Sequence, residues 1–195
     1  MIPTTLDLNS FSGDIWFTAD YHFGHENNIG YSKRPWKKIG THDHCLIDNA
    51  HAYVGKNDLF VINGDLTMQG PQQRNQVQKW ISKLPGIKIL VYGNHDKFMP
   101  LQYIDMGFSM AVTSLVLPGG IFVAHDPAWA QVWDVNKPVI CAHVHQLFKS
   151  IDNVVNCGVD VWDYFPVHLE ELLAECSESR GERDWQKASD GRHHG

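Results

Sequence analysis

The stretch Ile87-Lys-Ile-Leu-Val-Tyr92 leads directly into Gly93-Asn94-His95-Asp96. Its first six residues are mainly apolar and partly β-branched, which is typical of a buried strand, and the polar residues begin where that strand would end. In open α/β sheets, ligands bind just past the carboxyl ends of the strands, and a glycine there permits a tight turn or a close backbone approach. The stretch therefore predicts a strand that presents reactive side chains at one edge of a sheet.

Four other apolar runs, at 15–19, 59–62, 121–124 and 139–142, end in the same way. The polar segments that follow them are Asp20-Tyr-His22-Phe-Gly-His25, Asn63-Gly64-Asp65, His125-Asp-Pro127 and His143-Val-His145. Five strand ends that carry Asp, Asn or His predict that the strands converge on one polar site.

The segments between the first three predicted strands have the spacing of helices. Thr41 is the expected N-cap of a helix over 42–54, and Gly70-Pro71 opens a second helix that Pro85-Gly86 ends. Within that second helix the apolar residues Val77, Trp80, Ile81 and Leu84 recur at helical spacing. Alternation of strand and helix predicts right-handed crossovers and a parallel sheet.

The second half of the chain predicts a different, more antiparallel sheet. Residues 110–117 and 121–124 are expected to form a hairpin around Pro118-Gly119-Gly120, with strands at 139–142 and 153–157 and a last helix at 167–176. We therefore expect one α/β domain over residues 1–176. Residues 177–195 have the polar composition of a disordered tail, and its His193 and His194 are treated as incidental.

Composition limits the class of protein. With 195 residues, of which 43% are hydrophobic and 19% charged, the chain can bury a substantial core. A net charge of -6 argues against a broad basic surface for nucleic acid. The basic residues Lys33, Arg34, Lys37 and Lys38 form a local cluster that either holds a phosphate or lies in an ordinary solvated loop. Neither a secretion signal nor a membrane span is evident, and the four cysteines are dispersed, so we expect a cytoplasmic protein with reduced thiols and no membrane partner.

The polar segments contain a set of candidate metal ligands. Asp20-x-His22 and His143-x-His145 each place two ligands on one side of an extended backbone, and Asp65, Asn94 and His125 complete a set of seven. One tetrahedral ion needs only four ligands, so the set predicts two ions that share a carboxylate, orient a phosphate and make hydroxide available near neutral pH. Imidazole ligands favour Mn, Fe, Zn or Ni over Mg or Ca. Two carboxylates leave two divalent ions under-compensated, which predicts an anionic substrate.

These motifs, in this order, resemble the signature of the calcineurin-like metallophosphoesterases over roughly residues 14–170. The segments 20–29 and 156–167 are similar to a small phage and bacterial branch of that family. The resemblance implies two facing mixed β-sheets flanked by helices, a metallo-dependent phosphatase-like α/β/β/α sandwich. It also implies two ion sites that share Asp65 as a bridge. One would use Asp20, His22, Asp65 and His145, and the other Asp65, Asn94, His125 and His143.

The activity implied by the resemblance is hydrolysis of a phosphomonoester or phosphodiester by a metal-bridging hydroxide, with Mn as the first choice of metal. Asp65 and His95 would be catalytic, and His95 would protonate the leaving oxygen. Asn94, Arg34 and His25 are the expected substrate contacts, although His25 has loop packing as its alternative. Alternatives for the whole protein are a nuclease or cyclic-nucleotide phosphodiesterase, with a nucleotide or nucleic acid as substrate, and an inactive binding scaffold of the same fold. The sequence leaves the oligomeric state open.

Several residues depart from the family pattern or have two interpretations. Met68 stands where many members have an acid, so Asp96 is the candidate to orient His95; Ala142 replaces a glycine, and Tyr21 a small residue. Trp129, Trp133, Trp162 and Tyr164 either stack a nucleobase or belong to the core or rim. His42, His44, His51 and His168 fall on or beside predicted helices and are expected to be surface or packing residues.

Overall fold

The structure is a computed structural model, and it describes residues 3–7 and 12–176. The expected tail at 177–195 lies outside the described residues and stays a prediction.

The first sheet has the strand order β11-β2-β3-β4-β5. Its strands β2 (Ile15–Thr18), β3 (Leu59–Ile62), β4 (Ile87–Val91) and β5 (Met110–Val112) are parallel, and β11 (Val167–His168) joins β2 in the antiparallel direction. The parallel sheet predicted from the first half of the chain is therefore confirmed, and the carboxyl ends of β2, β3 and β4 lie at one edge.

The second sheet is mixed and has the order β1-β6-β7-β8-β10-β9. Its strands are β1 (Thr4–Thr5), β6 (Leu115–Leu117), β7 (Ile121–Val123), β8 (Val139–Cys141), β9 (Ser150–Ile151) and β10 (Val154–Asn156). The pairs β6–β7 and β9–β10 are antiparallel, whereas β1–β6, β7–β8 and β8–β10 are parallel. Two facing mixed sheets are the fold class expected from the sequence.

The predicted hairpin over 110–117 and 121–124 is only half right. Residues 110–112 pair in parallel with β4 of the first sheet, and only 115–117 pair with β7, through the 3-10 turn Pro118–Gly120. Met110 and Val112, like Leu115 and Leu117, contact the core between the two sheets. The chain therefore crosses from one sheet to the other around that core instead of continuing as one strand.

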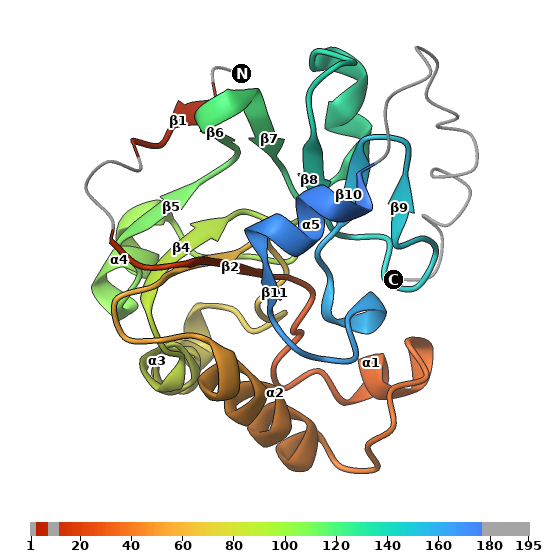
Figure 1. The fold of residues 1–195 in the computed structure, drawn as a ribbon. Coiled ribbons are helices and arrows are strands. Elements are labelled where there is room, and N and C mark those ends of the chain that lie inside the picture. The colour runs from red at the N-terminus through yellow and green to blue at the C-terminus, as the bar shows by residue number, and fades with distance from the viewer. Residues whose placement is uncertain (1–2, 8–11, 177–195) are drawn as a thin grey trace.

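Helices cover the outer face of the first sheet, as Figure 1 shows below the strands β2 to β5. They are α2 (Ile39–Tyr53), α3 (Arg74–Lys83, preceded by a 3-10 turn at Pro71–Gln73) and α4 (Pro100–Met106). Side chains alternate along β3, so that Phe60 and Ile62 pack against the helices while Leu59 and Val61 face the second sheet. Helix α2 begins before Thr41, because the Thr41 N–H already bonds to the Lys38 carbonyl in the first helical turn.

Four shorter elements complete the layers. Helix α5 (Leu169–Glu175) is capped by His168 and Glu171, and it buries Leu172 in the core between the sheets. The 3-10 segment Pro127–Val132 packs Ala130 against the outer face of the second sheet. Helix α1 (Glu26–Tyr31), which follows the loop after β2, was not predicted. A 3-10 turn at Val159–Val161 lies near the opposite end of the chain.

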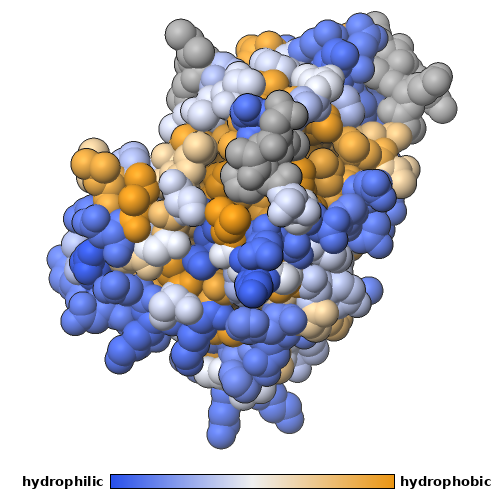
Figure 2. Space-filling model, turned by 60° about the vertical axis from the view of Figure 1, so that its left-hand side comes forward, coloured by the Kyte–Doolittle hydropathy of each residue, from blue (hydrophilic) through white to orange (hydrophobic). Residues whose placement is uncertain are grey.

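The surface is unevenly polar. Figure 2 shows hydrophilic residues over most of the lower part of the molecule and hydrophobic residues across its middle. Exposed apolar side chains include Met99, Leu101 and Ile104 at α4. Among the helices of the two described ranges, none combines the length and apolar character needed to cross a membrane.

Candidate metal centre

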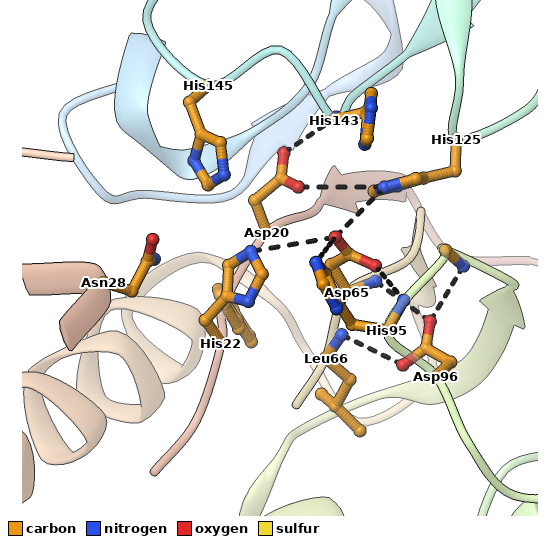
Figure 3. A network of polar contacts seen from close by, with 12 residues as sticks. Asp20, His22, Asn28, Asp65, Leu66, His95, Asp96, His125, His143 and His145 are labelled. Atoms are coloured by element: carbon orange, nitrogen blue, oxygen red, sulfur yellow. Dashed lines mark hydrogen bonds and ion pairs between the residues drawn. The ribbon is translucent and has the colours of Figure 1, made fainter. Parts of the chain in front are cut away.

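Six of the seven predicted ligands converge at the edge where the strands end. They form two groups, one of Asp20, His22 and His145 and the other of Asp65, His125 and His143 (Figure 3). In each group one carboxylate and two imidazoles offer donor atoms that lie within 4.8 Å of one another. The strand ends of both sheets thus meet at a single polar site, as the sequence predicted.

The backbone at these ligands is not extended, contrary to the sequence argument. Asp20, His22, Asp65, His143 and His145 all have positive φ angles, between 46° and 74°. Each loop therefore turns sharply, and His143 and His145 point into different groups rather than to one side. Non-glycine residues in this left-handed region are uncommon, and they persist only where the surroundings hold them.

Neighbouring backbone holds the Asp20 and Asp65 loops together. The Asp20 N–H donates to the Gly64 carbonyl at 3.1 Å, and the His22 N–H donates to the Asp65 carbonyl at 3.0 Å, so the pairing of β2 with β3 continues past the strand ends. Position 93 requires a glycine, because the Cβ of any other residue there would lie 2.1 Å from Asp65 Oδ1. The glycines of the predicted motifs thus let three loops approach each other.

The group around Asp65 is oriented mainly by backbone atoms. His125 Nδ1 donates to the Asn63 carbonyl at 2.7 Å, which turns His125 Nε2 toward Asp65 Oδ2 at 3.3 Å. Asp65 Oδ1 accepts the His95 N–H at 3.0 Å. Burial alone would raise the pKa of Asp65, but the hydrogen bond and charge of His125 bring that pKa well below its usual value.

Asp96 does not orient His95, so that expectation is wrong. Its carboxylate accepts the backbone N–H groups of Asp65, Leu66 and Gly93 at 2.8–3.2 Å and the Tyr103 hydroxyl at 3.4 Å. These N–H groups point at Asp96 because the loops after β3 and β4 both fold around its half-buried side chain. Asp96 therefore fixes the shape of the Asp65 loop.

The group around Asp20 is oriented by a buried ion pair. Arg34 Nε and Nη2 each donate to the Asp160 carboxylate at 2.8 Å, and His145 Nδ1 donates to Asp160 Oδ2 at 2.7 Å. Although burial raises the pKa of Asp160, its hydrogen bonds with His145 and Arg34 lower that pKa to about 2. Asp160 thus remains charged and leaves the other ring nitrogen of His145 facing Asp20 and His22. Asp160 lies within the motif 156–167, but no role was predicted for it from the sequence.

Arg34 is not a substrate contact, which corrects the sequence-based assignment. It is 4% exposed, and besides Asp160 it donates to the carbonyls of Asp20 at 2.6 Å and Tyr21 at 3.0 Å and contacts His42 Nε2 at 2.7 Å. Its neighbours Lys33, Lys37 and Lys38 are exposed. The cluster is therefore split, with Arg34 pointing inward and holding the Asp20 loop.

The buried polar atoms of the site fit bound cations. Within the described residues, Asp20 Oδ1, both ring nitrogens of His22 and His125 Nε2 are buried without a hydrogen-bond partner. Because His125 Nδ1 donates to a carbonyl, a neutral His125 ring turns a lone pair toward the Asp65 carboxylate. Only a proton or a metal ion between the two makes that arrangement favourable, and oxygen and imidazole donors suit transition metals.

A cavity of about 440 Å³ opens beside the two groups. Of the predicted site residues, it is lined by His22, His25, Asp65, Asn94, His95, His143 and His145, with Met68 also in its wall. His95 Nε2 lies 3.9 Å from Asp65 Oδ2. Asn94 and His95 therefore both face the space where a substrate would meet the ligands.

The four aromatic residues proposed for base stacking do not line this cavity. Trp133 stacks on Phe122, Trp162 donates its indole N–H to the Asn156 carbonyl, and Tyr164 packs edge-on against Trp36. Trp129 is partly exposed elsewhere. The aromatic residue in the cavity wall is Tyr31, which the sequence did not single out.

The helix histidines differ in burial. His42 is buried and contacts Arg34 and Asp43, whereas His44 and His51 are exposed and His168 packs against Trp16. Tyr21 is fully buried beside Phe23. The four helix histidines were expected to be surface or packing residues, and His42 additionally supports Arg34.

Three known proteins are similar to this chain in sequence. A protein of Methanocaldococcus jannaschii without a known function is 31% identical over 170 residues, which cover 82% of this chain and 89% of that protein. The Gene 66 proteins of Mycobacterium phages D29 and L5 are 34% identical over 88 and 89 residues. These matches span 45% and 46% of this chain and only 43% and 42% of the phage proteins.

A solved structure shares the fold. The crystal structure of a protein of unknown function from Aquifex aeolicus superposes with a TM-score of 0.61 at 23% identity, over 82% of this chain and 97% of that one. The sequence pattern of one family, described as calcineurin-like phosphoesterase, matches residues 13–190. With its two mixed sheets, its paired carboxylate–imidazole groups and this match, the chain belongs to the calcineurin-like phosphoesterases.

Proposed function

We propose that this chain is a dinuclear metal-dependent phosphoesterase. The observation that carries the proposal is the pair of three-residue groups, each with a carboxylate and two imidazoles, side by side at one cavity. Their buried atoms without partners, at Asp20, His22 and His125, support cations at both groups. Family membership supplies the reaction class, the hydrolysis of a phosphate ester.

The proposed ligands of one ion are Asp20, His22, Asp65 and His145, and those of the other are Asp65, Asn94, His125 and His143. Asp65 is the shared ligand, in keeping with its position between His22 at 3.7 Å and His125 at 3.3 Å. Mn²⁺ is the first candidate, and Fe, Zn or Ni also suit this donor set. Bound there, such ions would supply positive charge beside the phosphoryl group and make hydroxide available near neutral pH.

The chain's own residues have separate tasks in this proposal. Asn94 and His25 would contact the phosphate, since both line the cavity beside the two groups. His95 would give a proton to the leaving oxygen: its ring is partly exposed to the cavity and lies 5.5 Å from the His22 ring. Arg34 takes no part in substrate binding because its nitrogen atoms are engaged within the protein.

A nuclease or cyclic-nucleotide phosphodiesterase is a narrower version of the same proposal. An inactive binding scaffold is disfavoured, because such a protein would have no reason to keep six donor side chains assembled with buried, unpaired atoms. Elemental analysis and an activity panel separate these cases.

The decisive experiment is metal removal and restoration. We expect about two transition-metal ions per chain by elemental analysis, loss of hydrolysis after chelation, and recovery when Mn²⁺ or a similar transition-metal ion is restored. Mn²⁺, Ni²⁺, Zn²⁺ and Mg²⁺ are tested one at a time. The panel contains phosphomonoesters, phosphodiesters, cyclic nucleotides and single- and double-stranded nucleic acids. Activity that survives chelation in protein without metal would refute the proposal.

The role of His95 is tested with leaving groups of different basicity. His95→Ala should keep its metal and lose on the order of 10²- to 10⁴-fold in rate on alkyl esters, which is the usual range for removing a general acid. On p-nitrophenyl esters the loss should be much smaller, because p-nitrophenolate leaves without a proton. Single-turnover rates are needed so that chemistry limits both reactions, and His44→Ala serves as the control. Equal losses on both ester types would assign His95 to phosphate or metal positioning.

A further inference from the structure

One face of the short helix α1 forms a wall of the cavity. His25 is the N-cap of α1, and Asn28, Tyr31 and Ser32 follow at spacings that bring their side chains to the same face. All four residues line the cavity. This wall is next to the metal centre, since the His25 and His22 rings lie 5.8 Å apart.

Asn28 presents an unused hydrogen-bond donor on this wall. The side chain is 4% exposed, and Nδ2 is buried with no partner in the part of the chain that the structure describes. Its Oδ1 accepts the Ser32 hydroxyl at 3.1 Å, and Ser32 Oγ in turn lies 3.3 Å from His145 Nδ1. Ser32 thereby directs the oxygen of Asn28 to itself and leaves the NH₂ group for the cavity, beside His22 and His145 (Figure 3). A buried amide without a partner is costly, so Asn28 fits a ligand.

A further part of the cavity wall comes from the loop after β8. Val144, Gln146 and Leu147 line the cavity, and Gln146 Nε2 donates to the Ser32 carbonyl, which ties the loop to α1. Tyr31 is 63% exposed and Leu147 is 46% exposed, although both face the cavity. The outer part of the cavity thus offers one aromatic and one aliphatic surface, while its inner part offers neutral polar groups.

The wall carries no charge that would match a second phosphate charge. Among the described residues that line the cavity there is no Lys or Arg, and Asp65 is the single carboxylate. The charge of the phosphoryl group is therefore left to the two proposed metal ions next to this wall. A phosphodiester has one negative charge and a second organic group, and the α1 wall is where that group fits.

We propose that the α1 wall binds the nucleoside of a nucleoside phosphodiester, the substrate class of this site. Tyr31 stacks on the flat, uncharged base, with Leu147 as the aliphatic surface, and the Asn28 NH₂ group donates a hydrogen bond to the nucleoside. The inference rests on the proposed function. In the reaction, the oxygen of water bonds to phosphorus, the bond from phosphorus to the leaving oxygen breaks with its electron pair, and the leaving oxygen takes a proton. The products are a phosphomonoester and an alcohol.

The test compares esters that differ only in the group placed on the wall. Thymidine 5′-(p-nitrophenyl phosphate) and methyl p-nitrophenyl phosphate have the same charge and the same leaving group. We expect kcat/KM to be about fivefold or more higher for the thymidine ester, because stacking of a base on one aromatic side chain is worth at least about that factor. We also expect it to be higher than for p-nitrophenyl phosphate. Tyr31→Ala should bring the thymidine-to-methyl ratio close to one, and Asn28→Ala should lower it in part. Tyr53→Ala, which changes an exposed tyrosine away from the cavity, should keep the ratio.

A binding measurement separates this inference from the proposed function. Calorimetry on Mn²⁺-loaded protein should give thymidine 5′-monophosphate a Kd about tenfold lower than that of methyl phosphate, and Tyr31→Ala should remove the difference. If no ester is hydrolysed, the proposed function fails and the ratio of Kd values still decides the role of the wall. Parallel assays with a thymidine oligonucleotide and with a cyclic thymidine monophosphate distinguish a chain from a ring as the source of the nucleoside phosphodiester. Equal kcat/KM for the thymidine and methyl esters together with equal Kd values would overturn the inference, as would a preference for the monoester.

Discussion

The two ligand groups contain the same types of side chain, one carboxylate and two imidazoles, but neighbouring residues hold them in place in different ways. His125 is held by the Asn63 carbonyl, and the Asp65 loop by backbone N–H groups that converge on Asp96. His145, by contrast, is held by the charge of Asp160, and Asp160 by that of Arg34. The first kind of support depends on the shape of neighbouring loops, and the second on a pair of buried charges.

This difference matters because the two kinds of support fail differently. Asn63, Gly64 and Asp65 directly follow β3, and their backbone groups contact residues at or just after the ends of the neighbouring strands β2 and β4. The fold itself therefore positions them. Arg34 and Asp160 are 126 residues apart in the chain. Their side chains are fully buried, and removing either partner leaves an uncompensated charge. We therefore expect the Asp20 group to be the more vulnerable of the two.

The largest effect should come from Asp65→Asn, which removes the one residue placed in both proposed sites. The charge of this carboxylate is lost to both ions at once, so both should fail to bind. Activity should fall by at least on the order of 10³-fold, because several kcal/mol of charge stabilisation are lost. Metal titration of the purified variant checks the result. If one full-affinity ion remained, Asp65 would belong to a single group and the proposed bridge would be wrong.

An intermediate and selective effect is expected for Asp160→Asn. Loss of the charge that orients His145 should weaken one metal ion about 10- to 100-fold, which is typical for groups that orient a ligand. The second ion, at Asp65, Asn94, His125 and His143, should bind as in the wild type. Stepwise Mn²⁺ binding, followed by calorimetry or by electron paramagnetic resonance, distinguishes one weakened site from two.

The stability of this variant needs its own control. Arg34 would be left buried without its partner, at a cost of about 3–5 kcal/mol. The double variant Arg34→Gln with Asp160→Asn removes both charges and should recover part of the melting temperature, while the one weakened ion stays weak. A uniform loss at both sites in the double variant would show that the ion pair supports the whole fold and not one group.

The sequence predicted the fold class and the convergence of ligands because both depend on local patterns. Apolar runs define β2, β3 and β4, and glycines such as Gly64 and Gly93 mark where loops must approach closely. The split of residues 110–117 between two sheets could not be predicted. Both halves are apolar and extended, and only the packing of the complete core decides which sheet each one joins.

The roles of Arg34 and Asp160 were missed for a similar reason. In the sequence Arg34 stands among three exposed lysines, and no spacing rule shows that it alone turns inward to a carboxylate far along the chain. The extended geometry assumed for Asp20-x-His22 and His143-x-His145 was wrong because the left-handed turns are imposed by contacts between loops. Long-range side-chain contacts are thus what the sequence did not reveal.

The smallest effect is expected for His42→Ala, which tests how far the charge-supported network around Arg34 and Asp160 extends. The Nδ1 atom of His42 donates to Asp43 at 2.8 Å, and its Nε2 accepts from Arg34 at 2.7 Å, so His42 extends the chain of contacts that leads through Arg34 and Asp160 to His145. His42→Ala leaves Arg34 with Asp160 and two carbonyls, so we expect a stability loss of about 1–3 kcal/mol for the missing buried hydrogen bonds. The rise of melting temperature with Mn²⁺ should shrink only slightly. His44→Ala, two residues along the same helix and exposed, should change neither quantity measurably. If both variants kept the full stability and the full response to Mn²⁺, the charge-supported network would end at Arg34, and the Asp20 group would depend on the ion pair alone.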